Sequence, residues 1–310
     1  MRLSLLLVAA LIAVLAGCGD DGGAGGDAQV EAVATTTQAA DFVRNVGGSR
    51  VEVDGILPAN ADPHDYEPRP SDAAALAGAD VVFRSGGHLD EWLDEVIESA
   101  GGDATEVTLI DSVKTISGEH EEDDETDPHW WQDPRNAILA VGAVRDALVE
   151  ADPGGRAGYQ RRAAAYAGEL GRLDAEIARC IEKVPATRRK LVTTHDALGY
   201  LAARYGIEVV GAVIPSLSTQ AQPSAKDVDE LVHQIEDEGV EAIFPEVAVS
   251  QKLEQAISRE AGAEVGDELW TDTLGPAGSG AETYLDAMRV NAAALAKGMS
   301  GGRVTCGFSR

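Results

Sequence analysis

The chain has 310 residues, and its 25 Lys and Arg against 53 Asp and Glu give a formal net charge of −28. Hydrophobic residues make up 44% and charged residues 25%, which is typical of a globular protein and excludes a disordered or collagen-like chain. The negative charge argues against binding to nucleic acid, because phosphate groups need basic surface. The three cysteines are too few for a disulfide-rich scaffold or a four-cysteine zinc module.

Residues 1–17 are predicted to be a lipoprotein signal peptide. Arg2 precedes an unbroken apolar run, Leu5 to Ala16, which is too short to span a bilayer as a mature helix, and Cys18 follows small residues. We therefore expect an exported protein, lipid-anchored through Cys18 on the outer face of the cytoplasmic membrane, with residues 18–28 as a flexible tether. A plain signal peptide with a coincidental cysteine is the alternative.

Strand and helix patterns alternate through residues 29–153, which predicts a lobe with a parallel sheet and helices on its faces. The expected strands are 30–35, 51–57, 81–83 and 107–110. The expected helices are a stretch through Val46, a helix over 73–77 capped by Ser71 and Asp72, 89–97, and a helix from Asp133-Pro134 to about Val149.

Residues 154–184 carry no strand pattern, and apolar positions recur there at helical spacing. From about Arg156 to Lys183 the pattern predicts one helix, about 42 Å long at 1.5 Å per residue. We interpret it as a rigid strut between two lobes; an ordinary surface helix is the alternative.

Alternation resumes in residues 185–310, so the expected fold class is α/β, with two similar lobes of parallel sheet joined by the long helix and a site in the cleft between them. The expected strands of this second lobe are 191–194, 208–213, 242–244 and one near 268–271. The expected helices are 197–205, 224–237, 250–261 and 281–299.

The tripeptide Asp-Pro-His occurs twice and ends at His64 and His129. Proline fixes its own φ and restricts the residue before it, so each histidine is presented on a stiff loop. His195 and Asp272 each follow a predicted strand, which places them at the sheet edge where α/β folds bind ligands. Three imidazoles and one carboxylate can form a four-coordinate site for a divalent cation.

Each of these residues alone is weak evidence, because a single loop histidine is more often structural or solvated than a ligand. The case rests on their distribution. His64 and His129 belong to the first half of the chain, whereas His195 and Asp272 belong to the second. A site shared in this way would close the cleft when a metal ion binds.

Several stretches resemble the substrate-binding lipoproteins of metal-ion ABC importers, the cluster that includes zinc- and manganese-binding proteins. The resemblance covers nearly all of the mature chain and is carried by residues 62–72, 79–86, 129–136, 195–200 and 272–275. It implies two α/β lobes joined by one long helix, no enzymatic activity, and delivery of a divalent metal ion to the ABC permease of a cognate importer. It also implies four metal ligands: His64, His129, His195 and Asp272. We expect a monomer.

The choice of metal can be argued from the third ligand. In manganese members of the family that ligand is a carboxylate, whereas here it is His195. Imidazole suits Zn²⁺ and carboxylate suits Mn²⁺, so Zn²⁺ is favoured over Mn²⁺ or Fe²⁺. The alternatives are a secreted three-histidine zinc hydrolase and a metal-binding adhesin. A catalytic zinc keeps a position open for water, and Asp272 would fill that position.

The other histidines are weaker candidates. Residues 119–127 are mostly acidic and include only His120, so they form either a poor auxiliary metal loop or a solvated loop. His88 and His233 are expected to be surface residues.

Further side chains are expected to support the site. Glu246 follows a predicted strand and would orient a histidine, and Trp131 and Tyr200 would wall the site. Cys180 and Cys306, left over once Cys18 is lipidated, are expected to form a disulfide, with two free thiols as the alternative.

Overall fold

The computed structural model describes residues 29–118 and 125–308. The predicted signal peptide, Cys18, the tether and His120 lie outside the described residues. Within these ranges, no helix is both long enough and apolar enough to cross a membrane.

The first lobe is built on a parallel four-stranded sheet in the order β2-β1-β3-β4. Its strands are β1 (Val30–Ala34), β2 (Val51–Gly55), β3 (Val81–Arg84) and β4 (Thr105–Thr108). Its helices are α1 (Thr37–Gly47), α2 (Pro70–Gly78), α3 (Trp92–Ala100) and α4 (Pro134–Ala151). The central strands are apolar on both faces. In β3, Val82 packs toward α2 and α3, while Val81 and Phe83 join the core under α1 and α4.

The second lobe repeats this topology. Strands β5 (Lys190–His195) and β6 (Glu208–Ile214) pair in parallel, as do β7 (Ala242–Ile243) and β8 (Glu264–Val265). A parallel bridge between Thr193 and Phe244 joins β5 to β7, which gives the order β6-β5-β7-β8. The helices of this lobe are α6 (Gly199–Tyr205), α7 (Ala225–Glu238), α8 (Lys252–Ala261) and α9 (Tyr284–Met299). The expectation of two similar α/β lobes with parallel sheets is confirmed.

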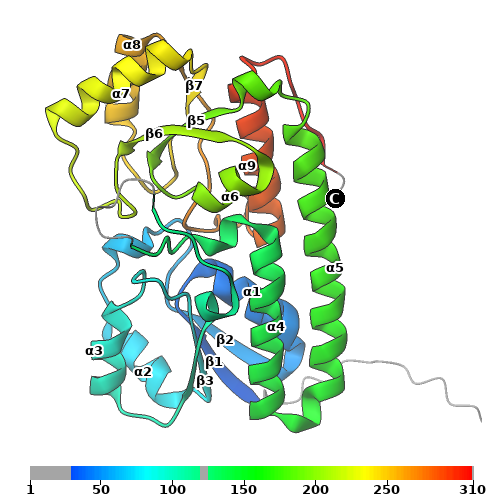
Figure 1. The fold of residues 1–310 in the computed structure, drawn as a ribbon. Helices are drawn as coiled ribbons and strands as arrows, with labels where there is room; N and C mark the ends of the chain where they lie inside the picture. Colours follow the sequence, from blue (N-terminus) through cyan, green and yellow to red (C-terminus); the bar gives the residue numbers. More distant parts are fainter. Residues whose placement is uncertain (1–28, 119–124, 309–310) are drawn as a thin grey trace, which may run out of the picture.

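One long helix, α5 (Arg156–Ile181), runs beside both lobes (Figure 1). It packs on α4 and α1 of the first lobe and on α9 of the second. Its buried residues recur every three or four positions, as on one face of an amphipathic helix. They include Tyr159, Ala163, Tyr166, Leu170, Leu173 and Ile177, and they belong to a hydrophobic core that is continuous through both lobes. This helix therefore fixes the distance between the lobes.

The strand expected near residues 268–271 is wrong, because only Leu269 forms a bridge there, with Glu246. The side chain of Asn291 replaces a neighbouring strand. Its Oδ1 accepts the Trp270 N–H at 2.8 Å and its Nδ2 donates to the Trp270 carbonyl at 2.7 Å. The true last strand, β8, has two exposed residues and carries no hydrophobic pattern to reveal it.

Two helix starts also differ from expectation. Helix α2 begins at Pro70, before Ser71, and Asp72 sits inside its first turn, where its carboxylate accepts the Arg69 N–H at 2.7 Å. Helix α3 begins at Trp92 because Asp90 holds the preceding residues in a turn. The Asp90 carboxylate accepts the Ser85 N–H at 2.7 Å.

The C-terminal tail is held on the second lobe by a disulfide between Cys180 of α5 and Cys306, with the two Cα atoms 5.7 Å apart. The bond closes a loop with a sequence separation of 126 residues. In the chain-entropy model such a loop stabilises the folded state by roughly 4–5 kcal/mol, which is an upper bound for real proteins.

We expect Cys306→Ser to lower the free energy of unfolding, measured by denaturant titration, by an amount within that bound. Unreduced, denatured protein that lacks residues 1–18 should titrate no free thiol. Wild-type protein in reductant should match the variant. Two titratable thiols, or a variant as stable as the oxidised wild type, would show that the bond is absent or without effect.

Candidate metal centre

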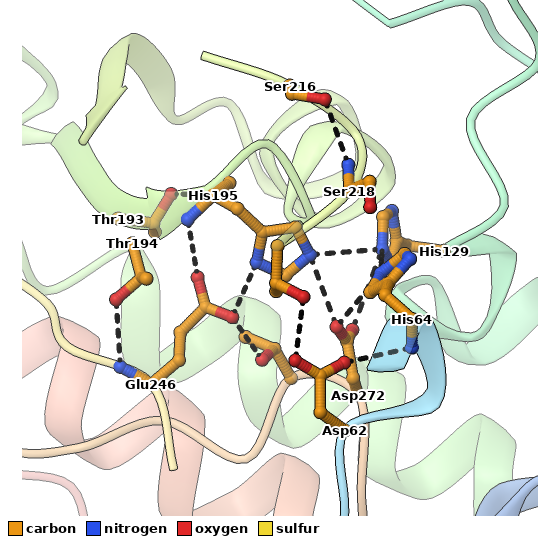
Figure 2. Close-up of polar contacts among 12 residues, drawn as sticks. Asp62, His64, His129, Thr193, Thr194, His195, Ser216, Ser218, Glu246 and Asp272 are labelled. Atoms are coloured by element: carbon orange, nitrogen blue, oxygen red, sulfur yellow. Dashed lines mark hydrogen bonds and ion pairs between the residues drawn. The ribbon is translucent and has the colours of Figure 1, made fainter. Parts of the chain in front are cut away.

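Four side chains from both lobes meet in the cleft (Figure 2). His64 lies in a short helical turn after β2, and His129 lies just before α4. His195 is the last residue of β5, and Asp272 follows the Leu269 bridge. His129 and His195 are fully buried and Asp272 is nearly so, whereas His64 is partly exposed.

The four ligand atoms lie within 4.8 Å of one another. The Nε2 atom of His129 is 3.3 Å from that of His195 and 3.4 Å from that of His64. Asp272 Oδ2 lies 3.1 Å from His195 Nε2 and 3.4 Å from His64 Nε2. A tetrahedral ion with bonds of about 2.05 Å has ligand-to-ligand edges of about 3.3 Å. The described residues can therefore enclose a single small cation.

Buried carboxylates orient two of the imidazoles from behind. Asp127 Oδ1 lies 2.7 Å from His129 Nδ1 and also accepts the His129 backbone N–H at 2.8 Å. Glu246 Oε2 lies 2.8 Å from His195 Nδ1, an ion-pair contact outside hydrogen-bond angles, and Glu246 Oε1 accepts the His195 N–H at 2.9 Å. A carboxylate at Nδ1 favours the tautomer whose proton is on that nitrogen. The Nε2 lone pairs then face the centre.

The aromatic residues expected to wall the site differ in position. Trp131 packs edge-on against the His129 ring, with 5.5 Å between ring centroids. Tyr200 instead contacts the backbone of the residue behind His129: its hydroxyl donates to the Asp127 carbonyl at 3.1 Å. Tyr200 therefore supports the loop that carries His129.

Sequence reasoning missed the two aspartates of the repeated tripeptide. Asp127 contacts the His129 ring, and Asp62 Oδ1 accepts the His64 N–H at 2.9 Å. The signal was the repeated Asp two residues before each histidine. The structure leaves His88 and His233 outside the cluster, exposed beside Glu91 and Asp229 respectively.

The buried imidazoles and carboxylates of the site shift one another's pKa values. Burial alone would lower the pKa of His195, but the Glu246 and Asp272 carboxylates outweigh burial and hold that pKa well above its usual value. Burial likewise opposes charge on His129, yet Asp272 and Asp127 raise its pKa. Burial alone would raise the pKa of Asp272, but His195 and His129 hold it well below its usual range. The carboxylates therefore favour the protonated form of both imidazoles in the metal-free protein, and a metal ion must displace any such proton.

Metal affinity should accordingly rise with pH through neutrality and level off only above the raised imidazole pKa values, because protonated nitrogen cannot bind metal. Calorimetry at pH 7 in buffers of different ionisation enthalpy should show net proton release on binding. Glu246→Gln should release fewer protons, since it removes a carboxylate that raises the pKa of His195. Affinity that is flat from pH 6 to 8 would contradict this account.

Asp127→Asn should weaken metal binding roughly 10- to 100-fold, the usual cost of losing a carboxylate behind a ligating imidazole. Competition titration against a chelator of known affinity measures the change. Asp229→Asn is the matched control, because Asp229 lies 3.9 Å from the exposed His233 and should leave affinity unchanged. Equal effects of the two substitutions would remove Asp127 from the site.

The chain matches one protein family and is similar to metal-binding proteins of other organisms. The family described as "Zinc-uptake complex component A periplasmic" matches residues 32–298. The manganese-binding lipoprotein MntA of Halalkalibacterium halodurans is 33% identical over 299 residues, which cover 96% of this chain and 97% of the relative. The zinc-binding protein TroA of Treponema pallidum is 33% identical over 267 residues, covering 84% of this chain and 86% of TroA.

A solved structure of the periplasmic zinc-binding protein TroA from Treponema pallidum is similar in fold. It superposes with a TM-score of 0.80 at 30% identity and covers 87% of this chain and 98% of that chain. The similarity therefore extends over both lobes and the long helix.

Proposed function

The chain belongs to the family of periplasmic zinc-uptake component A proteins, and we propose that it delivers zinc to a membrane permease. Members of this family are substrate-binding proteins of metal transporters and not enzymes. More broadly, the chain is an extracytoplasmic divalent-metal-binding protein of an ABC importer. The ion is the cargo of the protein, held between the lobes until it is handed over.

The observation that carries the proposal is the convergence of electron-rich atoms in the cleft. Three imidazole nitrogens and the Asp272 carboxylate face one another at 3.1–3.6 Å. Asp272 Oδ1 is buried and has no hydrogen-bond partner among residues 29–118 and 125–308. Buried acceptors without partners are costly, and a bound cation removes that cost. His64, His129, His195 and Asp272 are therefore the proposed ligands.

Zinc is the proposed cargo, since three nitrogens and one oxygen suit Zn²⁺ better than Mn²⁺. The zinc-binding relative TroA supports this choice. Manganese is the second candidate, because MntA is 33% identical, like TroA, over a larger share of this chain, and Asp272 offers a second oxygen for a larger coordination number. Iron is less favoured.

The N-terminal sequence supports lipid anchoring through Cys18, and the name of the relative MntA as a lipoprotein agrees with it. On this proposal the anchor holds a monomer on the outer face of the membrane, where the folded lobes can reach the permease.

Elemental analysis of protein purified without chelator tests the proposal. We expect one zinc per chain, and zinc retained against an equal concentration of manganese. His195→Ala should lose most of this metal because it removes one of four ligands. His233→Ala is the matched control and should keep it, since His233 is exposed and outside the site. Displacement of zinc by manganese would reassign the cargo. Full occupancy in His195→Ala would refute the site.

A further inference from the structure

The four proposed ligands are not held equally, and the difference bears on how the ion enters and leaves. His129 and His195 are fully buried, and each ring has a carboxylate behind it. His64 as a residue is partly exposed, although its side chain, 7% exposed, is about as buried as that of Asp272, 8% exposed. In the described part of the chain, the only carboxylate within ion-pair distance of His64 is Asp272, which lies inside the site. Its ring therefore lacks the support that fixes the other two.

The turn that carries His64 is held instead by the opposite lobe. Asp62 Oδ1 accepts the His64 N–H at 2.9 Å, and Asp62 Oδ2 accepts the hydroxyl proton of Thr219 at 2.6 Å. Gln220 Nε2 donates to the His64 carbonyl. Thr219 and Gln220 lie in the loop between β6 and α7. In Figure 2, Asp62 lies beside His64 at the edge of the cluster.

That loop is itself anchored next to another ligand. The Ser216 carbonyl accepts the backbone N–H of Asp196, the residue after His195, at 3.0 Å. The Ser218 N–H donates to the Ser216 hydroxyl at 3.1 Å. The contacts of Thr219 and Gln220 therefore join the turn that carries His64 to the part of the second lobe that carries His195.

A cavity of about 190 Å³ is lined in part by His64. Its lining includes His64, Trp92, Glu125, Pro128, Ser216 and Leu217, and His64 is the only one of the four proposed ligands among the lining residues. His64 is therefore the proposed ligand that an ion in this cavity can contact directly.

We propose that His64 is the ligand through which the metal ion exchanges, and that Thr219 and Asp62 are positioning residues that set the exchange rate. This inference rests on the proposed metal site. The Thr219–Asp62 hydrogen bond must break for the His64 turn to swing away, while His129 and His195 stay in place. A hydrogen bond to a charged group is strong enough to change such a rate roughly tenfold.

The test is stopped-flow release of Zn²⁺ from the zinc-loaded mature protein into excess chelator. Thr219→Val keeps the side-chain shape and removes the hydroxyl, so it should speed zinc release roughly tenfold. The dissociation constant should change less than the release rate, because entry also requires the turn to open. Thr219→Ser keeps the hydroxyl and should release zinc within about twofold of wild type.

The His64→Ala background separates positioning from a general structural effect. If Thr219 acts through His64, Thr219→Val adds no further acceleration to His64→Ala. Equal acceleration in both backgrounds, or none in the wild-type background, overturns the inference. Should Thr219→Val fail to fold, Gln220→Leu serves in its place, since it removes the bond to the His64 carbonyl. Wild-type protein that binds no metal would instead refute the proposed function.

Discussion

The structure depends on one electrostatic constraint, the close approach of four electron-rich groups in a buried place. His129 and His195 are fully buried and their Nε2 atoms are 3.3 Å apart, with the Asp272 carboxylate beside them. Without a cation or a proton between them, such groups repel one another at low dielectric. The protein holds them together through the packing of two lobes. This arrangement makes the cleft a cation site and couples occupancy to proton release.

The lobes are joined in a way that places the ligands. Helix α5 sets their separation, and hydrogen bonds cross the cleft directly beside the site. Trp131 Nε1 and Gln132 Nε2 both donate to the Thr271 carbonyl at 2.8 Å. These donors are close in sequence to His129, and the acceptor precedes Asp272. A first-lobe ligand and a second-lobe ligand are therefore held in register by shared bonds, with little freedom left to order when an ion binds.

The four proposed ligands are supported by different kinds of contact. Asp127 and Glu246 belong to the same lobe as the imidazoles that they orient, so they hold those rings whether the cleft is open or closed. The His64 turn is held by Thr219 across the cleft and loses that support on opening. A carrier must bind its cargo firmly and still release it. The rings of His129 and His195 are held by carboxylates of their own lobes, which favours firm binding. The His64 turn is held only while the lobes are together, which favours release.

The sequence by itself determined the α/β class, the long helix and the residues proposed as ligands, because each has a local signal. These signals are strand and helix alternation, helical spacing over α5, the repeated Asp-Pro-His, and the position of His195 at a strand end. Asp272 was found from a predicted strand that the structure reduces to the single Leu269 bridge. Only the tertiary structure decided which residues contact and support the proposed ligands. Asp62 and Thr219 are 157 residues apart, and Trp131 and the Thr271 carbonyl are 140 apart. β8 and the Asn291 contacts with Trp270 were likewise invisible, because they depend on which chain segments fold against each other.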